Sequence, residues 1–218
     1  MNIGLGRLVS IDDRDKAFPM KAALPAIEED RKIRYWYQSA YWGNQGSTSH
    51  CVAHSWTHWL KDGPVTQKNY KPDQPELYRI CQELDEWPGS AYEGTSVRAG
   101  AKALLSQGLI KEYLWTWNVE ELAQAIIKVG PVVVGTNWYR DMSKPIKGIA
   151  KPTGMLDGGH AYLINGVNIN KGMFRLKNSW GRGYGKNGNA YISFEDIQTL
   201  LNQDGECCLA IEAKIENN

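Results

Sequence analysis

The sequence predicts an α+β protein in which a helical N-terminal half is followed by a half built from antiparallel strands. Between residues 51 and 127, apolar residues recur at the three- and four-residue spacing of amphipathic helices. From residue 131 onward, short runs rich in β-branched and aromatic residues alternate with turn residues such as Gly and Asn. Elements segregated in this way pack as separate layers, and a binding cleft is expected at the seam between them.

Four helices are predicted in the first half. The central helix begins at Cys51 and ends before Gly63-Pro64, which cannot continue it. A later helix is predicted to be capped by Thr95 and stopped by Gly108. The predicted helices cover residues 51–60, a segment from residue 75 to about 81, 96–107 and 119–127.

The second half is predicted to hold five strands, with a short helix at 194–201 between the last two. The strands cover residues 132–135, 160–167, 172–177, 189–193 and 207–213. These elements divide the chain into an N-terminal arm (1–40), a helical lobe (41–112) and a β-rich lobe (113–218). The arm carries charged clusters around residues 12–15 and 28–32, a composition typical of a solvated, loosely ordered segment.

Length and charge narrow the class of protein. A chain of 218 residues suffices for one large domain or two lobes around a shared cleft. Its formal net charge of +1 predicts neither a nucleic-acid partner nor an anionic membrane. The first eight residues lack the apolar core and cleavage site of a signal peptide, and no apolar stretch reaches the ~20 residues that span a bilayer. We therefore expect a cytoplasmic protein, in the host cytoplasm if the chain is viral.

Four residues, in chain order, are the parts of a thiol acyl-transfer site: Gln45, Cys51, His160 and Asn178. A free thiol has a pKa near 8.5 and is mostly protonated at neutral pH. Cys51 opens a predicted helix, whose N-terminal N–H groups and dipole stabilise an anion. A neighbouring imidazolium stabilises the thiolate further, so the sequence predicts Cys51 as a nucleophile.

The other three residues have complementary roles in this chemistry. His160 is expected to return a proton to the leaving amine, and the carbonyl oxygen of Asn178 to accept the second imidazole N–H and orient the ring. The Gln45 amide and the backbone N–H of Cys51 are expected to donate to the developing oxyanion. One such donor is worth about 3–4 kcal/mol.

These residues resemble the papain/cathepsin family of cysteine peptidases. Gln45 stands six residues before Cys51, as the family's oxyanion glutamine stands before its nucleophile. His160 lies in a Gly-His-Ala context, and residues 176–188 match the family's Lys-Asn-Ser-Trp-Gly block almost letter for letter. The resemblance covers roughly residues 42–212. It implies a papain-like two-lobed fold with the active-site cleft between the lobes, and an endopeptidase that hydrolyses peptide bonds through a thioester.

The resemblance also implies five substrate contacts: Gly94, Thr95, Gly159, Trp180 and Glu212. Gly94 and Thr95 resemble the glycine segment that lines the non-prime side of the cleft. Counting five residues from Cys207 places Glu212 at the floor of the pocket for the second residue before the scissile bond. A carboxylate there would pair with a substrate Arg or Lys, although Glu212 also fits a solvated residue near the C-terminus.

The chain departs from the family at positions that concern disulfides. Thr48 replaces a family cysteine three residues before the nucleophile, Val52 replaces an aromatic residue, and no cysteine lies near Gly154. A bridge between the adjacent Cys207 and Cys208 would be strained. We therefore expect four free thiols, as in a reducing compartment, and a disulfide-free member of microbial or viral origin.

No metal or cofactor is expected. His50 and His54 flank Cys51, but a metal site needs three or four converging ligands and no carboxylate or further cysteine is nearby in the sequence. The expected partner is a polypeptide substrate, a proteinaceous inhibitor or regulator is left open, and a monomer is expected.

Two alternative functions remain open from the sequence. The same four residues would serve an acyl transferase or an amidase/isopeptidase, because the acyl-enzyme half-reaction is identical. A catalytically silent papain-like binding protein is the other alternative, but it has no chemical reason to keep all four residues. The intact chain is expected to be active under reducing conditions without processing, or to be restrained by a separate partner or by residues 1–40.

Overall fold

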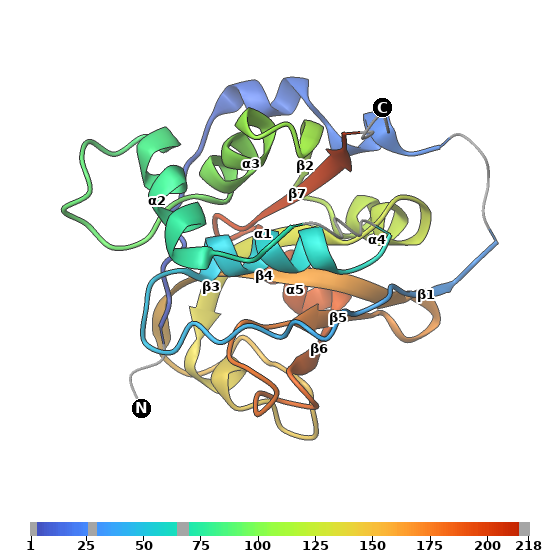
Figure 1. The fold of residues 1–218 in the computed structure, drawn as a ribbon. Helices are drawn as coiled ribbons and strands as arrows, with labels where there is room; N and C mark the ends of the chain where they lie inside the picture. The colour runs from blue at the N-terminus through green and yellow to red at the C-terminus, as the bar shows by residue number, and fades with distance from the viewer. Residues whose placement is uncertain (1–3, 26–29, 65–69, 214–218) are drawn as a thin grey trace.

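The computed structural model describes residues 4–25, 30–64 and 70–213. A seven-stranded antiparallel sheet forms its centre, with strand order β2-β7-β3-β4-β5-β6 and β1 paired to β4 (Figure 1). The strands are β1 (Ile33–Tyr35), β2 (Ile110–Thr116), β3 (Val132–Tyr139), β4 (Leu156–Asn168), β5 (Met173–Lys177), β6 (Asn189–Ser193) and β7 (Glu206–Glu212). The parts of the predicted arm at 1–3 and 26–29, and the chain end at 214–218, lie outside the described residues.

Five α-helices complete the described fold, and most begin at a side-chain cap. They are α1 (Cys51–Lys61), α2 (Gln74–Leu84), α3 (Val97–Ser106), α4 (Val119–Lys128) and α5 (Phe194–Leu201). The capping side chains belong to Asp73, Ser96, Asn118 and Ser193, each accepting a backbone N–H of the first turn. For α1, no such side-chain bond is found within the described chain.

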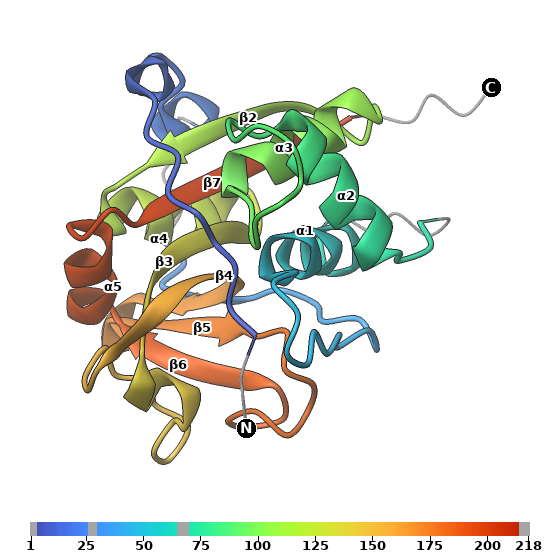
Figure 2. The same cartoon turned by 90° about the vertical axis from the view of Figure 1, so that its left-hand side faces the viewer.

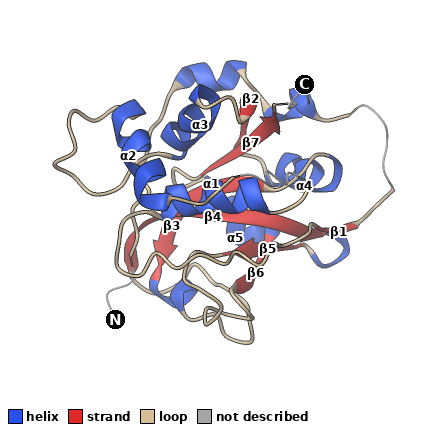
Figure 3. Cartoon of the chain, viewed as in Figure 1, coloured by secondary structure: helices blue, strands red, loops and turns tan. Residues whose placement is uncertain are grey.

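Strand alternation divides the apolar core into two clusters on opposite faces of the sheet. Val132 and Val134 of β3 pack with α4 and α5, whereas Val133 packs with α1, α2 and α3. On β4, Ile164 belongs to the first cluster and Leu163 to the second. Helices α1, α2 and α3 thus form a helical lobe on one face of the sheet (Figure 3).

The predicted elements are present, with corrections at their ends. The helix at 194–201 and the strand at 189–193 match the observed bounds, and the strands predicted at 132–135 and 160–167 are longer in the structure. Ser96, not Thr95, caps α3, because the Ser96 hydroxyl accepts the Ala99 N–H. Strands β1 and β2 were not predicted, and β2 crosses the expected lobe boundary at residue 112.

The arm is ordered over its described residues, contrary to the expectation of a loose, solvated segment. Met20 is fully buried in the sheet's core, and two short 3₁₀ turns follow one another at Asp13–Ala17 and Met20–Ala23. Asp15 is buried against the guanidinium of Arg98 on α3, with hydrogen bonds to both carboxylate oxygens. The charged cluster alone could not predict this order, because Arg98, the partner of Asp15, lies 83 residues further along the chain.

A buried ion pair joins the end of α1 to the end of β5. Lys177 Nζ lies 2.9 and 3.0 Å from the two carboxylate oxygens of Asp62, and neither side chain is exposed. Asp62 also accepts hydrogen bonds from the Ser39 backbone N–H and the Asn165 amide, and Lys177 donates to the Tyr41 carbonyl. Every strong acceptor of the carboxylate is therefore used, which is the condition under which a buried pair is tolerated.

Replacing Asp62 by Asn should lower the free energy of unfolding by about 3–5 kcal/mol, because it leaves the Lys177 ammonium buried without a counter-charge. The double change Asp62→Asn with Lys177→Met should cost less than Asp62→Asn alone, because no charge is then left unpaired. Denaturant unfolding of the three variants measures this. A loss below 1 kcal/mol for the single change would contradict the assignment.

Candidate active site

Cys51 is the first residue of α1 and is completely buried. His50, the residue at the helix N-cap, offers no side-chain acceptor to the first turn within the described chain. The first N–H groups of α1 therefore remain available to an anion, which is the electrostatic environment a thiolate needs. Cys51 packs in the same buried cluster as Ala161, the residue that follows His160 on β4, and the Ala161 backbone N–H lowers the pKa of the Cys51 thiol.

His160 and Asn178 form the second part of the site. His160 Nε2 lies 2.8 Å from Asn178 Oδ1, and the same oxygen accepts the Ser179 backbone N–H at 2.8 Å. Because Oδ1 is the acceptor, Nε2 carries the hydrogen and Nδ1 is left with its lone pair. Nδ1 is buried and has no hydrogen-bond partner among the described residues, so it is available to take the thiol proton.

Two tryptophan rings hold the His160 imidazole in place. Trp180 is tilted by 31° against it at 4.9 Å between centroids, and Trp138 meets it edge-on at 4.6 Å. Trp138 is fully buried and was not predicted from the sequence. Its place on β3, opposite Gly158, follows from the strand register and cannot be read from the local sequence.

Gln45 is tied to the same segment that holds Asn178. Its backbone N–H donates to the Ser179 carbonyl at 2.8 Å, and its side-chain oxygen accepts the Ser179 hydroxyl at 2.5 Å. The amide nitrogen is thereby turned towards the nucleophile loop, where it donates to the carbonyls of Thr48 and Gly4 at 2.8 and 3.1 Å. Gln45 thus already binds a carbonyl oxygen, the group whose charge an oxyanion donor stabilises.

The Gly4 carbonyl belongs to the N-terminal arm, which runs across β7, β3 and β4 beside α1 (Figure 2). Gly4 and Gly6 press against the loop before Cys51: a Cβ at these positions would lie 2.1 Å from the Thr48 carbonyl oxygen and 2.2 Å from the Ser49 carbonyl oxygen. Glycine is required at both positions for this approach. The segment 4–8 covers the predicted catalytic residues.

Backbone hydrogen bonds hold the segment on both sides of the seam. On the helical side, Thr95 N–H donates to Gly6 O and Leu8 N–H to Thr95 O, both at 2.9 Å, in a parallel bridge. On the other side, Gly159 O accepts the N–H groups of Gly6 and Arg7 at 3.0 and 3.1 Å. Three of the five expected substrate-contact positions, Gly94, Thr95 and Gly159, therefore contact this segment.

Burial changes the charge states of Cys51 and His160. Burial raises the pKa of the Cys51 thiol to about 12, although the Ala161 and Val52 backbone N–H groups and the Arg7 charge act in the opposite direction. Burial also lowers the pKa of His160 to about 4, against the effect of its Asn178 hydrogen bond. In the covered state, both groups are therefore neutral at pH 7.

Glu212, the residue expected at a pocket floor, lies away from the seam. It ends β7 opposite Ile110 of β2, whereas the other end of the strand, Glu206, lies opposite Gly135 of β3. The carboxylate that contacts the arm is that of Glu206, which pairs with Arg7. Counting from a cysteine could not locate it, because the register of β7 against β3 decides which carboxylate faces the seam.

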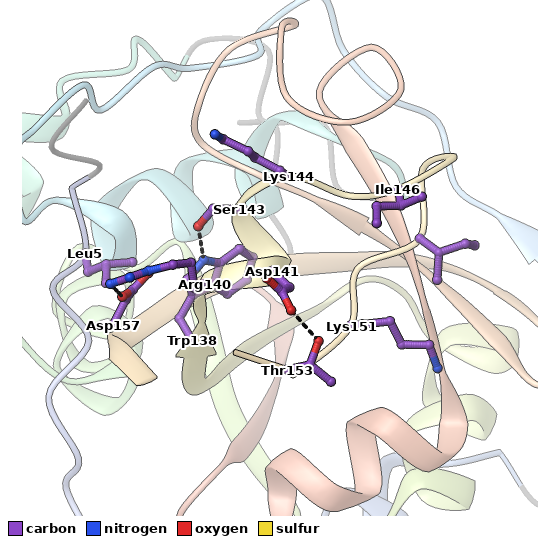
Figure 4. Close-up of a pocket in the computed structure, with 11 residues that line it drawn as sticks. Leu5, Trp138, Arg140, Asp141, Ser143, Lys144, Ile146, Lys151, Thr153 and Asp157 are labelled. Atoms are coloured by element: carbon purple, nitrogen blue, oxygen red, sulfur yellow. Dashed lines mark hydrogen bonds and ion pairs between the residues drawn. The ribbon is translucent and has the colours of Figure 1, made fainter. Parts of the chain in front are cut away.

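A pocket of about 950 Å³ adjoins the site at Trp138, which packs against His160. Figure 4 shows Leu5 of the arm and Trp138 at one end of it, beside the ion pair between Arg140 and Asp157. Ile146 and Ile149 add apolar lining. The pocket is large enough to take side chains of a substrate beyond the residue at the nucleophile.

The remaining histidines have structural partners. His50 stacks on Tyr78 at 4.3 Å between centroids, His54 contacts the Tyr41 hydroxyl, and His58 bonds to the Trp42 carbonyl. Within the described residues, no group of three or more His, Cys, Asp or Glu side chains converges as a metal site would require. All four cysteines fall inside the described ranges and are unpaired and buried.

The fold and the candidate residues Cys51, His160 and Asn178 are those expected of a cysteine hydrolase. Residues 38–215 match the model of the papain family cysteine proteases. The chain therefore belongs to the papain family of cysteine proteases. No helix in the described part of the chain is long and apolar enough to cross a membrane.

Known proteins similar to this chain come from several organisms. It is 29% identical over 153 residues to cathepsin B-like cysteine proteinase 3 of Ostertagia ostertagi, covering 62% of this chain and 87% of the relative. Among solved structures, it is similar to xylellain, a cysteine protease from Xylella fastidiosa, with a TM-score of 0.75, 19% identity, and coverage of 98% and 97% of the two chains. Procathepsin L 3 of Tenebrio molitor gives a TM-score of 0.69 at 14% identity, with 96% and 76% covered. The structural likenesses show the fold.

Asn178→Ala should lower kcat by about ten- to a hundredfold and change KM much less, because it frees the His160 ring without touching a substrate. Steady-state kinetics on a cleaved peptide measure both constants. Asn187→Gly is the matched control, since Asn187 is exposed, adopts φ +53°, and lies in the same loop region. An unchanged kcat for Asn178→Ala would show that another group orients the imidazole.

Proposed function

We propose that this chain is a cysteine endopeptidase that hydrolyses peptide bonds in polypeptides through a thioester acyl-enzyme. The observation that carries the proposal is the His160 imidazole, fixed through Nε2 on Asn178 and left with a free Nδ1, on a strand that packs against α1, the helix that begins at Cys51. A base oriented by a third group beside a nucleophile at a helix N-terminus is the arrangement that covalent catalysis requires.

The proposed reaction uses each group once in each half-cycle. Cys51 Sγ attacks the peptide carbonyl carbon while its proton passes to His160 Nδ1. The Gln45 amide and the Cys51 backbone N–H hold the oxyanion. His160 then protonates the amine as the C–N bond breaks, leaving a thioester. Water attacks this thioester, giving its proton to His160, and the free carboxyl and the thiol are regenerated.

The arm must leave the seam for this reaction to occur. Segment 4–8 occupies Gln45, Thr95 and Gly159 with its own backbone, so a substrate chain has to displace it. Of the three forms of control considered from the sequence, these contacts favour restraint by residues 1–40. Four unpaired buried thiols suit a reducing compartment, which supports a cytoplasmic location as part of the proposal.

A thiol-directed epoxide should modify Cys51 in preference to the other cysteines, because only Cys51 gains thiolate character when the site opens. Mass spectrometry of the labelled chain identifies the residue, and a peptide-library cleavage profile run beside it reports hydrolysis. Cys51→Ala should abolish both the labelling and the peptide hydrolysis. Cys81→Ala, a change in the core of the helical lobe, should abolish neither of them.

The same assay separates the alternative functions. A transferase would incorporate an added amine in place of releasing a free carboxylate, and a silent binding protein would give neither product. Equal labelling of all four cysteines at pH 6 would contradict a distinct ion pair at Cys51.

Gly6→Ala should raise the turnover of the full chain by roughly tenfold, because the new Cβ would lie 2.2 Å from the Ser49 carbonyl oxygen and push the arm off the site. Gly183→Ala is the matched control, since nothing lies within 4 Å of a Cβ at Gly183. Initial rates of peptide hydrolysis by the two variants and the parent chain measure the effect. Equal rates for all three would show that segment 4–8 does not limit activity.

A further inference from the structure

Arg7 of the arm is buried in a pocket that ends at a carboxylate. Its side chain is 1% exposed, and Nε and Nη2 lie 3.1 and 3.0 Å from the same oxygen, Oε1, of Glu206. Nη2 also donates to the carbonyl oxygen of Asp204. The Glu206 side chain is itself only 7% exposed, so the guanidinium and the carboxylate are both removed from water.

A glycine in the middle of β3 makes room for this pair. A Cβ at Gly135 would lie 2.9 Å from Arg7 Nε and 3.1 Å from Glu206 Oε1, and 2.8 Å from a methyl carbon of Val97. Glycine inside a strand weakens it and marks a close approach of another group. The pocket is therefore bounded by Val97 on α3, Gly135 on β3 and Glu206 on β7. It is deep enough for the Arg7 side chain only because Gly135 has no side chain.

The pocket opens where a substrate would pair with the protein. Arg7 stands opposite Thr95, whose N–H and C=O hold the arm's backbone. Side chains of an extended chain alternate between its two faces whichever way the chain runs. A substrate paired with Thr95 in place of the arm would therefore also direct a side chain into the pocket.

We propose that this pocket is a specificity site for arginine in the substrate, with Glu206 as the residue that selects the guanidinium. The inference rests on the proposed peptidase function and adds the substrate class. Burial raises the pKa of the Glu206 carboxyl and the Arg7 charge opposes this, so the carboxylate needs a cationic occupant to stay ionised. An uncharged side chain of the same shape leaves Glu206 without that partner.

The geometry favours arginine over lysine. Arg7 makes three contacts from two nitrogens, two to Glu206 Oε1 and one to the Asp204 carbonyl. A lysine ammonium is a single point of charge and cannot reach two separate acceptors in one plane as a guanidinium does. The arm therefore fills the pocket with an arginine, the same side chain that the pocket is proposed to select in a substrate.

Alkylation of Cys51 in the full chain tests the inference. The probes are peptidyl chloromethyl ketones with Arg, or its uncharged isostere citrulline, at the first, second or third residue before the reacting carbonyl. Each observed rate is the intrinsic rate multiplied by the fraction of molecules with the arm displaced. The Arg/citrulline ratio cancels that fraction, so it reports the pocket alone. At one of the three positions, we expect the parent chain to prefer Arg by at least about tenfold.

Three variants separate selection from restraint by the arm. Glu206→Gln should raise both rates, because the arm loses its ion pair, and should bring the ratio close to one. Arg7→Gln should also raise both rates but leave the ratio unchanged, because the pocket is intact. Glu212→Gln is the same change at the far end of β7 and should leave the ratio unchanged.

The outcomes distinguish the inference from the function on which it rests. A ratio near one at all three positions in the parent chain, which needs no variant to fold, would overturn the arginine site while Cys51 is still labelled. An Arg preference that persists in Glu206→Gln but is lost in Glu212→Gln would overturn the assignment to Glu206. No labelling of Cys51 by any probe would overturn both the peptidase proposal and the inference.

Discussion

The buried ion pair between Asp62 and Lys177 sets the geometry on which the rest of the site depends. Helix α1 carries Cys51 at its first residue and is capped at its other end by Asp62. Lys177 ends β5 and directly precedes Asn178. The pair therefore fixes the helix that presents the nucleophile against the strand that presents the orienting residue. A polar contact between fully buried groups has few alternative geometries, so it specifies the position of the two lobes more strictly than apolar packing does.

The surface that the arm contacts is formed largely by backbone groups and by glycines, which have no side chain. Gly94, Gly135 and Gly159 each stand where a Cβ would strike the arm, at 2.5 Å from Gly6 O, 2.9 Å from Arg7 Nε and 2.2 Å from Arg7 O. All three lie beside the seam, on elements whose positions are set by the sheet and by α3. Rigid elements with bare backbone let another chain approach closely enough to form a β-like pair.

The fold class could be predicted from the sequence, and the candidate catalytic residues could be proposed from it, because both depend on local pattern. Gln45, Cys51, His160 and Asn178 stand in short motifs whose chemistry is evident from residue type and order, and strand alternation from residue 131 onward is regular. Glu206 could not be predicted, because its role depends on the register of β7 against β3. The order of the arm was missed for a similar reason, since the partners of Arg7 and Asp15 lie 199 and 83 residues away.

In the function proposed here, contact with the arm and burial of the site both restrain reactivity. The arm lies against Gln45 and the loop before Cys51, and burial raises the pKa of the Cys51 thiol while it lowers that of His160. When a substrate displaces the arm, water is readmitted to the groups before the new chain closes over them. The helix N-terminus and the imidazole can then stabilise the thiolate. Under the proposed specificity, a chain that occupies the seam without arginine in the Glu206 pocket would have to compete with an arm that has one, so the Arg7–Glu206 ion pair would set the threshold a substrate must exceed.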